Sequence, residues 1–396
     1  MIRPQLILAK GREKSLLRRH PWIFSGAVKT VTGNPDAGET VEVADASGKV
    51  LALAAYSPCS QLTGRVWSFE PEENIDIGFF RRRLRDAAAL RKELGLDVPG
   101  GGCRLVYSES DGLPGIIVDK YDRIAVLQLL SAGAEFHRKN IVSALMELEG
   151  IAGVFERSDA SIRRREGLPP ASGHLAGDDA GRMTITENGL KYEVDPQHGQ
   201  KTGFYFDLRD ARKRLRDFVC GKRILNMFSY TGAFAVNALD AGAEYVINCD
   251  SSRPALELAE RNLELNGFDD SKYENICGDC FEIIKQMRGN QEKFDVVILD
   301  PPKLIDSRNA LERGCRAYQF LARNGFELLD TGGVMFNFSC SGLMVPELFH
   351  KITASAAAET GCDAQILGFL QQSADHPVDI STPETLYLKG IISRKK

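Results

Sequence analysis

In the first 70 residues, short alternations of apolar and polar residues are separated by turn-forming residues. This alternation predicts strands over residues 40–44, 50–55 and 65–69. Asp45-Ala46-Ser47-Gly48 separates the first two of these and predicts a hairpin. Residues 10–19 are basic and predict a short helix. The segment therefore reads as a small, mostly β domain.

The middle of the chain mixes helical and strand-like patterns, which indicates an α/β region. Asn188-Gly189 lies between two alternating stretches, and this dipeptide is a strong signal for a tight hairpin. A loop rich in proline, glycine and serine is expected over residues 167–181. The expected helices span residues 77–94 and 140–148, and the expected strands span residues 104–107, 115–118, 124–130, 183–187 and 190–194.

After residue 207 the pattern alternates regularly between helix and strand. Ser251 or Ser252 is a suitable helix cap, with Pro254 in the first turn and Gly267 beyond the end. Such alternation predicts a parallel, doubly wound sheet, so the fold class is α/β. Helices are expected over residues 207–219 and 232–241, and strands over residues 223–226, 245–249, 294–299 and 333–338.

These patterns divide the chain into four segments. We expect a small β domain, a central α/β domain, a β-hairpin with its connector, and a doubly wound domain. Their boundaries are residues 1–72, 73–181, 182–206 and 207–396.

The composition adds three points to this picture. The chain has 396 residues, 43% of them hydrophobic, without an apolar stretch long enough for a membrane span or a secretory signal at the start, which predicts a cytoplasmic protein. Its nine scattered cysteines do not form a disulfide framework. Residues 1–69 hold nine Lys and Arg against five acids, although the whole chain has a net charge of −4. A basic module on an acidic body suits a nucleic-acid partner, although a solvated face remains the alternative.

Three acidic or polar segments follow expected strands, at the edge where open α/β sheets bind ligands. Residues 226–232 form a turn that opens a helix, and Asp250 and Asp279 follow the next strands. Asp250 lies 18 residues after Gly232, close to the spacing of a ribose-binding acid. Capping of helices is the alternative for each acid, and a nicotinamide cofactor would need a fuller glycine fingerprint. The three together favour S-adenosylmethionine.

Two further strand ends carry the candidate chemistry. Asp300-Pro301-Pro302-Lys303 is a rigid turn that directs a carboxylate and carbonyl groups into the pocket. Cys340 follows the next strand, and a thiolate that adds to carbon 6 of cytosine makes carbon 5 able to accept a methyl group. Asp300 is suited to hold N3 of that ring. Methylation of a purine amine, with Cys340 only a packed side chain, is the alternative.

The chain resembles the bacterial ribosomal RNA large subunit methyltransferase I family, which makes 5-methylcytosine in 23S rRNA. The resemblance covers almost the full length. It implies an N-terminal PUA domain, which is a small β-barrel, a central domain with a β-hairpin, and a Rossmann-like C-terminal methyltransferase domain. The matching segments are residues 8–22, 199–207, 228–232, 300–303, 338–342 and 374–377.

The resemblance also implies roles for individual residues. Cys340 is the expected nucleophile, with Asp300 beside it in catalysis. Pro301 stands where many RNA cytosine-C5 methyltransferases have a second cysteine, so the base that removes the C5 proton is left open. The expected contacts of S-adenosylmethionine are Lys201, Thr202, Asn226, Phe228, Ser229, Tyr230, Thr231, Gly232, Asp250, Asp279 and Asp300.

Basic residues in two places are the candidates for RNA binding, because phosphate contacts give affinity and register. Arg209, Lys213 and Arg216 fall on one face of the expected helix, although a solvated face explains them equally well. No metal is expected, because Cys277 and Cys280 lack a second pair of ligands. The expected RNA contacts are Lys10, Arg12, Lys14, Arg18, Arg19, Arg209, Lys213 and Arg216.

The sequence thus predicts an S-adenosylmethionine-dependent RNA cytosine-C5 methyltransferase, with 23S rRNA as its expected substrate. A purine RNA methyltransferase is the alternative within enzymes. A non-catalytic RNA-binding factor of ribosome assembly is the alternative from another class, and the intact acids and Cys340 argue against it.

Overall fold

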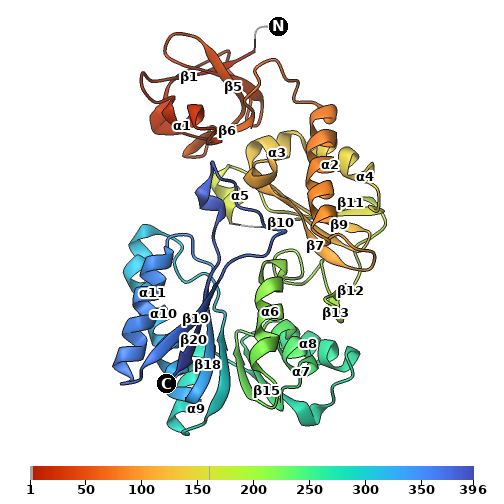
Figure 1. Ribbon diagram of the computed structural model, residues 1–396. Coiled ribbons are helices and arrows are strands. Elements are labelled where there is room, and N and C mark those ends of the chain that lie inside the picture. Colours follow the sequence, from red (N-terminus) through yellow and green to blue (C-terminus); the bar gives the residue numbers. More distant parts are fainter. Residues whose placement is uncertain (1–2, 160) are drawn as a thin grey trace. The chain divides into compact units, whose positions relative to one another are not determined.

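A computed structural model describes residues 3–159 and 161–396 of the chain. The chain forms two compact units (Figure 1). The first unit holds residues up to 185 together with 194–206 and 374–385, and the second unit holds residues 186–193, 207–373 and 386–396. The chain therefore passes five times between the units. The boundaries at residues 72, 181 and 206 stay predictions.

The N-terminal part of the first unit is a six-stranded sheet with strand order β2-β6-β5-β4-β1-β3. Alternate side chains such as Leu6, Val41 and Val43 point into its fully buried core. The expected basic helix is only four residues long, α1 (Lys14–Leu17), and Lys10 and Arg12 lie in the turn before it. The strands are β1 (Gln5–Leu8), β2 (Trp22–Phe24), β3 (Val28–Thr32), β4 (Thr40–Ala44), β5 (Val50–Tyr56) and β6 (Leu62–Ser68).

The central part of the first unit is a five-stranded sheet with order β11-β10-β9-β8-β7. Helices α2 and α4 pack against each other and against this sheet (Figure 1). Helix α2 begins where the Asp76 carboxylate accepts a hydrogen bond from the Phe79 amide, 3.1 Å away. The elements are α2 (Ile77–Glu93), β7 (Gly102–Tyr107), β8 (Ile116–Tyr121), β9 (Ile124–Leu129), α3 (Ala132–Phe136), α4 (Arg138–Met146), β10 (Gly153–Ser158), α5 (Ile162–Arg165) and β11 (Ala171–Gly177).

The expectation of a loop over residues 167–181 is wrong, because β11 lies within it. Its sequence, Ala-Ser-Gly-His-Leu-Ala-Gly, has small residues and no apolar alternation, so nothing local predicts a strand. The strand exists because β10 supplies an antiparallel hydrogen-bonding partner. Strand β10 itself was not predicted, since it is buried along its whole length and shows no alternation.

The second unit is built on a seven-stranded sheet with order β16-β15-β14-β17-β18-β20-β19. The first five strands are parallel, as the alternation predicts, but β20 runs antiparallel to both of its neighbours, β18 and β19. The sheet is therefore mixed, because the direction of a strand depends on its connection. The strands are β14 (Arg223–Met227), β15 (Tyr245–Asp250), β16 (Tyr273–Cys277), β17 (Phe294–Leu299), β18 (Leu329–Ser339), β19 (Ala364–Leu370) and β20 (Lys389–Lys395).

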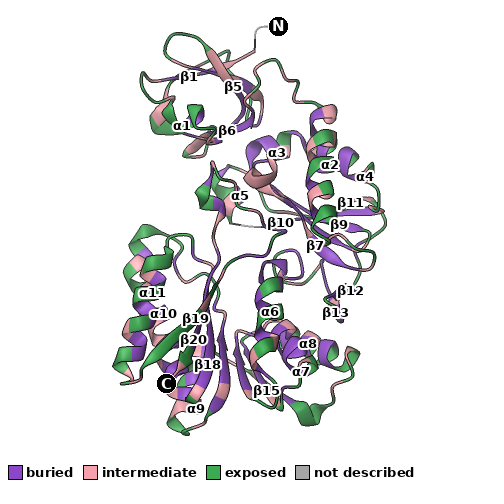
Figure 2. Ribbon diagram, in the orientation of Figure 1, coloured by how far each residue is buried: buried purple, intermediate pink, exposed green. Residues whose placement is uncertain are grey.

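Helices cover both faces of this sheet, and the central strands are buried along their length (Figure 2). Val297 and Leu299 pack with residues of α9, α10 and α11 on one face. The rings of Phe336 and Phe338 contact Phe218 and Phe234 among the preceding helices. The expected helix over residues 207–219 is α-helical only in its middle. The helices are α6 (Arg209–Leu215), α7 (Ala233–Asp240), α8 (Arg253–Leu265), α9 (Cys280–Gly289), α10 (Leu311–Leu328) and α11 (Pro346–Glu359).

The hairpin predicted from Asn188-Gly189 is confirmed as β12 (Met183–Glu187) and β13 (Leu190–Val194). Its tip, residues 186–193, belongs to the second unit. There the buried Glu187 carboxylate accepts two hydrogen bonds from the Arg212 guanidinium, at 2.7 and 2.8 Å. The Tyr192 hydroxyl accepts one from Asn237, 2.8 Å away. The hairpin is thus part of the packing of the second unit.

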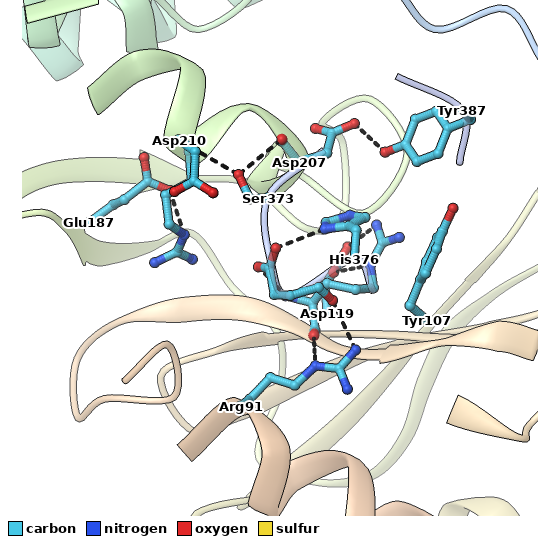
Figure 3. Close-up of polar contacts among 12 residues, drawn as sticks. Arg91, Tyr107, Asp119, Glu187, Asp207, Asp210, Ser373, His376 and Tyr387 are labelled. Carbon is cyan, nitrogen blue, oxygen red and sulfur yellow. Dashed lines mark hydrogen bonds and ion pairs between the residues drawn. The ribbon is translucent and has the colours of Figure 1, made fainter. Parts of the chain in front are cut away.

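Residues 374–385 leave the second unit between β19 and β20 and join the first. Two side chains, which lie just before and just after this segment, are hydrogen-bonded within the second unit (Figure 3). Ser373 donates to the Asp207 carbonyl oxygen at 3.0 Å, and the Tyr387 hydroxyl donates to the Asp207 carboxylate. Asp207 therefore determines where the chain departs and returns. Among the described helices, none combines the length and apolarity of a membrane span.

Candidate functional site

The loop after β14 has an unusual backbone. Phe228, Tyr230 and Gly232 all have positive φ angles, of 60°, 49° and 74°. Gly232 is required at its position, because a Cβ atom there would lie 2.9 Å from the Cβ of Ala259 in α8. Alternating left-handed residues bend the chain sharply before α7. The loop is thereby held close to the carboxyl end of the neighbouring strand, where ligands of open α/β sheets bind.

Asp250 fixes this loop to the end of β15. Its carboxylate accepts hydrogen bonds from the Tyr230 amide at 2.8 Å and from the Ser252 amide at 2.9 Å. The residue is 8% exposed. Each oxygen thus has one protein donor and keeps further acceptor capacity for a ligand.

Three buried polar atoms, one near the end of β14 and two in the loop after it, lack a hydrogen-bond partner in the described part of the chain. The Asn226 Oδ1, Ser229 Oγ and Thr231 Oγ1 atoms are buried and make no hydrogen bond to the described residues. Asn226 uses only its amide group, which donates to Asn248 at 2.9 Å. Buried polar atoms are normally satisfied, so these three point to a polar ligand or ordered water at the loop. They fit a cofactor with an amino acid and a ribose, such as S-adenosylmethionine.

Asp279 lies at the N-terminus of α9 and is exposed. One oxygen of its carboxylate accepts hydrogen bonds from the amides of Phe281 and Glu282, at 2.8 and 3.4 Å. This is the helix cap that was the alternative interpretation. The second oxygen has no partner among the described residues, so a contact with a cofactor stays a prediction.

Asp300 and Cys340 follow neighbouring parallel strands. Leu299, the last residue of β17, pairs with Asn337 near the end of β18. The Cys340 Sγ atom lies 4.0 Å from the carbonyl oxygen of Pro301. Asp300 and Cys340 are both partly exposed. The structure thus brings the predicted nucleophile next to the Asp-Pro-Pro turn.

The turn that carries Cys340 is held in place by Ser341. The Ser341 hydroxyl accepts a hydrogen bond from the Ile305 amide at 3.2 Å and is 3.0 Å from the hydroxyl of Tyr318 in α10. Burial raises the pKa of Tyr318, so this phenol stays protonated. Neither Ser341 nor Tyr318 was predicted as part of the site.

Lys389, the first residue of β20, is a further residue at this turn that sequence reasoning missed. Its Nζ atom donates to the carbonyl oxygens of Ser341 and Tyr387, at 2.8 and 2.6 Å. Burial lowers the pKa of this lysine to about 8. A signal was present in the sequence, since Lys389 interrupts the apolar run of Leu388, Ile391 and Ile392.

Comparison with known proteins identifies the family to which this chain belongs. A family model described as S-adenosylmethionine-dependent methyltransferase matches residues 158–375, and a PUA-like domain model matches residues 6–69. A protein named ribosomal RNA large subunit methyltransferase I, from Serratia proteamaculans, is 49% identical over 98% of this chain and 99% of its own. The protein of that name from Escherichia coli is 48% identical over the same shares. This chain belongs to the ribosomal RNA large subunit methyltransferase I family.

The fold agrees with this membership. A putative S-adenosylmethionine-dependent methyltransferase from Streptococcus mutans has a TM-score of 0.85 at 24% identity, with both chains fully covered. A structure with the same TM-score and identity, also with both chains fully covered, is described as a putative methyltransferase complexed with SAH. The resemblance predicted from the sequence motifs is confirmed, as are the fold class and the assignment to S-adenosylmethionine-dependent methyltransferases.

Two of the predicted cofactor contacts lie in the first unit of this methyltransferase, whereas the others lie in the second. Thr202 is buried, and its hydroxyl donates to the Asp119 carboxylate at 2.5 Å. Lys201 has a positive φ of 51°, and its Nζ atom lies 4.4 Å from the centre of the Tyr205 ring. A contact between either residue and the cofactor stays a prediction.

Two other cysteines of the methyltransferase domain are buried, and burial disfavours their thiolate forms. Cys280 is buried, which raises the pKa of its thiol to about 12, and burial raises the pKa of Cys249 as well. Cys277 is exposed, and no group of three potential metal ligands occurs in the described part of the chain.

The predicted RNA contacts fall into two groups. The five basic residues near the N-terminus are all exposed, and within the described residues only Arg19 among them forms an ion pair, at 3.9 Å from Glu70. Arg209 is only 7% exposed and lies 3.6 Å from Glu187, and Arg216 pairs with Asp240 at 2.7 Å. Arg209 is therefore largely buried beside the Glu187 carboxylate, and RNA contacts of Arg209, Lys213 and Arg216 stay predictions. Lys213 is exposed.

Proposed function

We propose that this enzyme methylates carbon 5 of a cytosine in 23S rRNA, in the cytoplasm, and that Cys340 is its nucleophile. The observation that carries this proposal is the position of Cys340 Sγ, 4.0 Å from the Pro301 carbonyl oxygen. A thiol is thereby next to the Asp-Pro-Pro turn that begins with Asp300, at the edge of the sheet that also bears the cofactor loop. A thiol is needed for C5 chemistry and has no use in amine methylation.

The cofactor contributes an electrophilic methyl group, and the chain supplies the contacts that hold it. The unpartnered Ser229 and Thr231 hydroxyls and Asn226 Oδ1 are suited to its polar groups. Asp250 is suited to accept the ribose hydroxyls through the acceptor capacity that its two amide bonds leave free. Asp279 offers its second oxygen to the adenine amine.

Cys340 and Asp300 act on the base. The Cys340 thiolate forms a bond to C6, and the electron pair of the C5–C6 double bond makes C5 nucleophilic. Asp300 shares a proton with N3, and this proton offsets the negative charge that the added electron pair brings to the ring. After C5 accepts the methyl group, a base removes the C5 proton, the double bond reforms and the thiolate leaves. Pro301 supplies a backbone carbonyl where related enzymes have a second thiol, so water or the Asp300 carboxylate is the candidate base.

The basic segment at the N-terminus is suited to hold RNA. Lys10, Arg12, Lys14 and Arg18 are exposed and have no carboxylate partner within the described residues. Unpaired cations on one segment attract phosphates without reading sequence. Lys213 is the residue of the second group that the structure leaves available.

A trapping experiment tests the proposed chemistry. The enzyme with S-adenosylmethionine and RNA that contains 5-fluorocytosine should form a complex that survives denaturing electrophoresis, because fluorine at C5 cannot leave as a proton does. Methylation of a purine amine needs no adduct. An enzyme that methylates unmodified RNA but gives no complex would exclude the covalent mechanism. Mapping of 5-methylcytosine in rRNA from cells with and without the gene then identifies the target.

Asp250→Ala is expected to weaken cofactor binding by about 10- to 100-fold for each charge-assisted hydrogen bond that is lost, because one such bond contributes about 1.5–3 kcal/mol. Titration calorimetry with S-adenosylhomocysteine measures this. Asp295→Asn is the matched control, because Asp295 also accepts a backbone amide, Arg223 at 2.9 Å, but lies at the opposite end of the parallel strands. Equal affinities of Asp250→Ala and wild type, with both folded, would remove Asp250 from the site.

Replacement of Lys10, Arg12, Lys14 and Arg18 by alanine should weaken RNA binding and reduce its salt dependence. The slope of log K against log salt should fall by roughly 0.7 for each lost phosphate contact. Binding titrations at several salt concentrations measure the slope. The double variant Lys29→Ala, Lys49→Ala removes exposed charge from the same domain and should change the slope little. Equal slopes for the two variants would show that the basic segment is only solvated.

A further inference from the structure

Lys389 is a buried amine whose surroundings do not explain its charge. The residue is 7% exposed, and its partners in the described structure are the two carbonyl oxygens of Ser341 and Tyr387. No carboxylate lies within ion-pair distance among the residues that the structure describes. A buried ammonium ion without an opposite charge is costly, and it is normally paired. Two of its three N–H groups are used by the carbonyl groups, so one donor remains.

The location of Lys389 indicates where an opposite charge can arise. Strand β20 pairs antiparallel with β18, and Lys389 is directly opposite Ser339. Its Nζ atom reaches the carbonyl oxygen of Ser341. Lys389 therefore contacts the residues on both sides of Cys340. Burial lowers the pKa of Lys389, and the negative charge of a Cys340 thiolate raises it.

We propose that the ammonium ion of Lys389 stabilises the thiolate form of Cys340 and so activates the nucleophile. This inference rests on the proposed function of Cys340. Lys389 acts through another residue, so it is a positioning residue. A cationic neighbour favours the thiolate because it lowers the free energy of the charged form.

The other charged and titratable groups around this turn are consistent with that role. Burial is the largest influence on the pKa of Lys389 and lowers it to about 8, the Cys340 thiolate raises it, and the charge of Lys303 lowers it. The Tyr318 phenol stays neutral, and Asp300 lies across the turn beside Pro301. At pH 7 the amine is thus mostly protonated. An ammonium ion has no lone pair, so Lys389 is unsuited to remove the C5 proton.

Alkylation of Cys340 measures its ionisation without RNA and without turnover. The rate of reaction with iodoacetamide at each pH, followed by mass spectrometry of the Cys340 peptide, gives the midpoint of thiolate formation. Lys389→Gln keeps hydrogen-bond donors for the two carbonyl oxygens and removes the charge. It should raise the midpoint by about one pH unit and slow alkylation at pH 7 about tenfold. Lys389→Arg keeps the charge and should restore most of the rate.

Lys395→Gln is the matched control on the same strand. The Nζ atom of Lys395 also donates to two carbonyl oxygens, those of Phe326 and Leu329, and its neighbouring thiol is Cys362. This variant should leave the alkylation of Cys340 unchanged. A midpoint for Cys340 that is the same in folded Lys389→Gln and in wild type would overturn the inference. If Lys389→Gln does not fold, a wild-type midpoint at or above about 8.5, the ordinary value for cysteine, would overturn it instead.

The two proposals fail in different ways. If Cys340→Ala still methylates RNA, the proposed function fails, yet the alkylation midpoints can still show the coupling between Lys389 and Cys340. If Lys389→Gln leaves the midpoint unchanged while the 5-fluorocytosine complex forms, only the role of Lys389 is lost. When both hold, the acidic limb of the pH profile of kcat/KM should move upward in Lys389→Gln, parallel to the alkylation midpoint.

Discussion

Cys340→Ala is expected to lose methyl transfer by roughly 10⁴-fold or more, the scale at which enzymes that lose their covalent nucleophile fail. Carbon 5 of cytosine is a poor nucleophile until a thiolate has added to C6, so the remaining groups cannot substitute. Binding of RNA and cofactor should remain nearly normal, because the substitution removes one Sγ atom and leaves the cofactor loop and the basic N-terminal segment unchanged. Methylation of RNA with radiolabelled S-adenosylmethionine measures the loss.

The control for this variant is Cys362→Ala. Cys362 lies in the same unit and is also partly exposed, but it follows α11 rather than a strand end of the site. It should retain wild-type turnover. Near-wild-type activity in a folded Cys340→Ala protein would contradict the covalent mechanism. The purine-methylating alternative would then be preferred, and the position of the methyl group in the RNA would decide it.

Glu187→Gln is expected to destabilise the second unit by about 3–5 kcal/mol. The carboxylate is fully buried and makes two hydrogen bonds to Arg212, which is also buried, and it lies 3.6 Å from Arg209. Removing one charge from a buried pair leaves the other uncompensated in a medium of low polarity. Urea denaturation followed by circular dichroism measures the free energy of unfolding.

Glu193→Gln provides the comparison within the same hairpin. Glu193 pairs with the exposed Arg261 at 3.2 Å, and exposed ion pairs contribute about 0–1 kcal/mol. The loss of stability in Glu193→Gln should therefore be small. If the two variants unfold at the same urea concentration, then water enters around Glu187 and the pair is not buried in solution. A large effect of Glu187→Gln would establish that the hairpin tip stabilises the methyltransferase sheet.

Much of the candidate site could be predicted because its residues follow strands. Asn226, Asp250, Asp300 and Cys340 each come after or within an apolar run that forms a strand, and parallel strands place their ends at one edge. The partners of Cys340 could not be predicted in this way. Lys389 is 49 residues further along the chain and reaches the turn only because β20 inserts antiparallel beside β18.

The basic residues of α6 show in the same way what a local pattern cannot predict. The spacing of Arg209 and Lys213 is that of one helix face, but Glu187 on the hairpin draws the first inward while the second remains exposed. Helical periodicity specifies which residues share a face. It does not specify whether that face meets water or a buried carboxylate from a distant segment.

By itself, the sequence determined the elements whose signals are local. The hairpin of β12 and β13 follows from Asn188-Gly189 between alternating residues, and the start of α8 follows from Ser252 and Pro254. Only the tertiary structure decided that β11 is a strand, that β20 runs antiparallel to its neighbours β18 and β19, and that Lys389 lies beside Cys340. Each of these depends on a hydrogen-bonding partner or a charge supplied by a segment remote in sequence, and a local pattern of residues cannot encode which segment arrives.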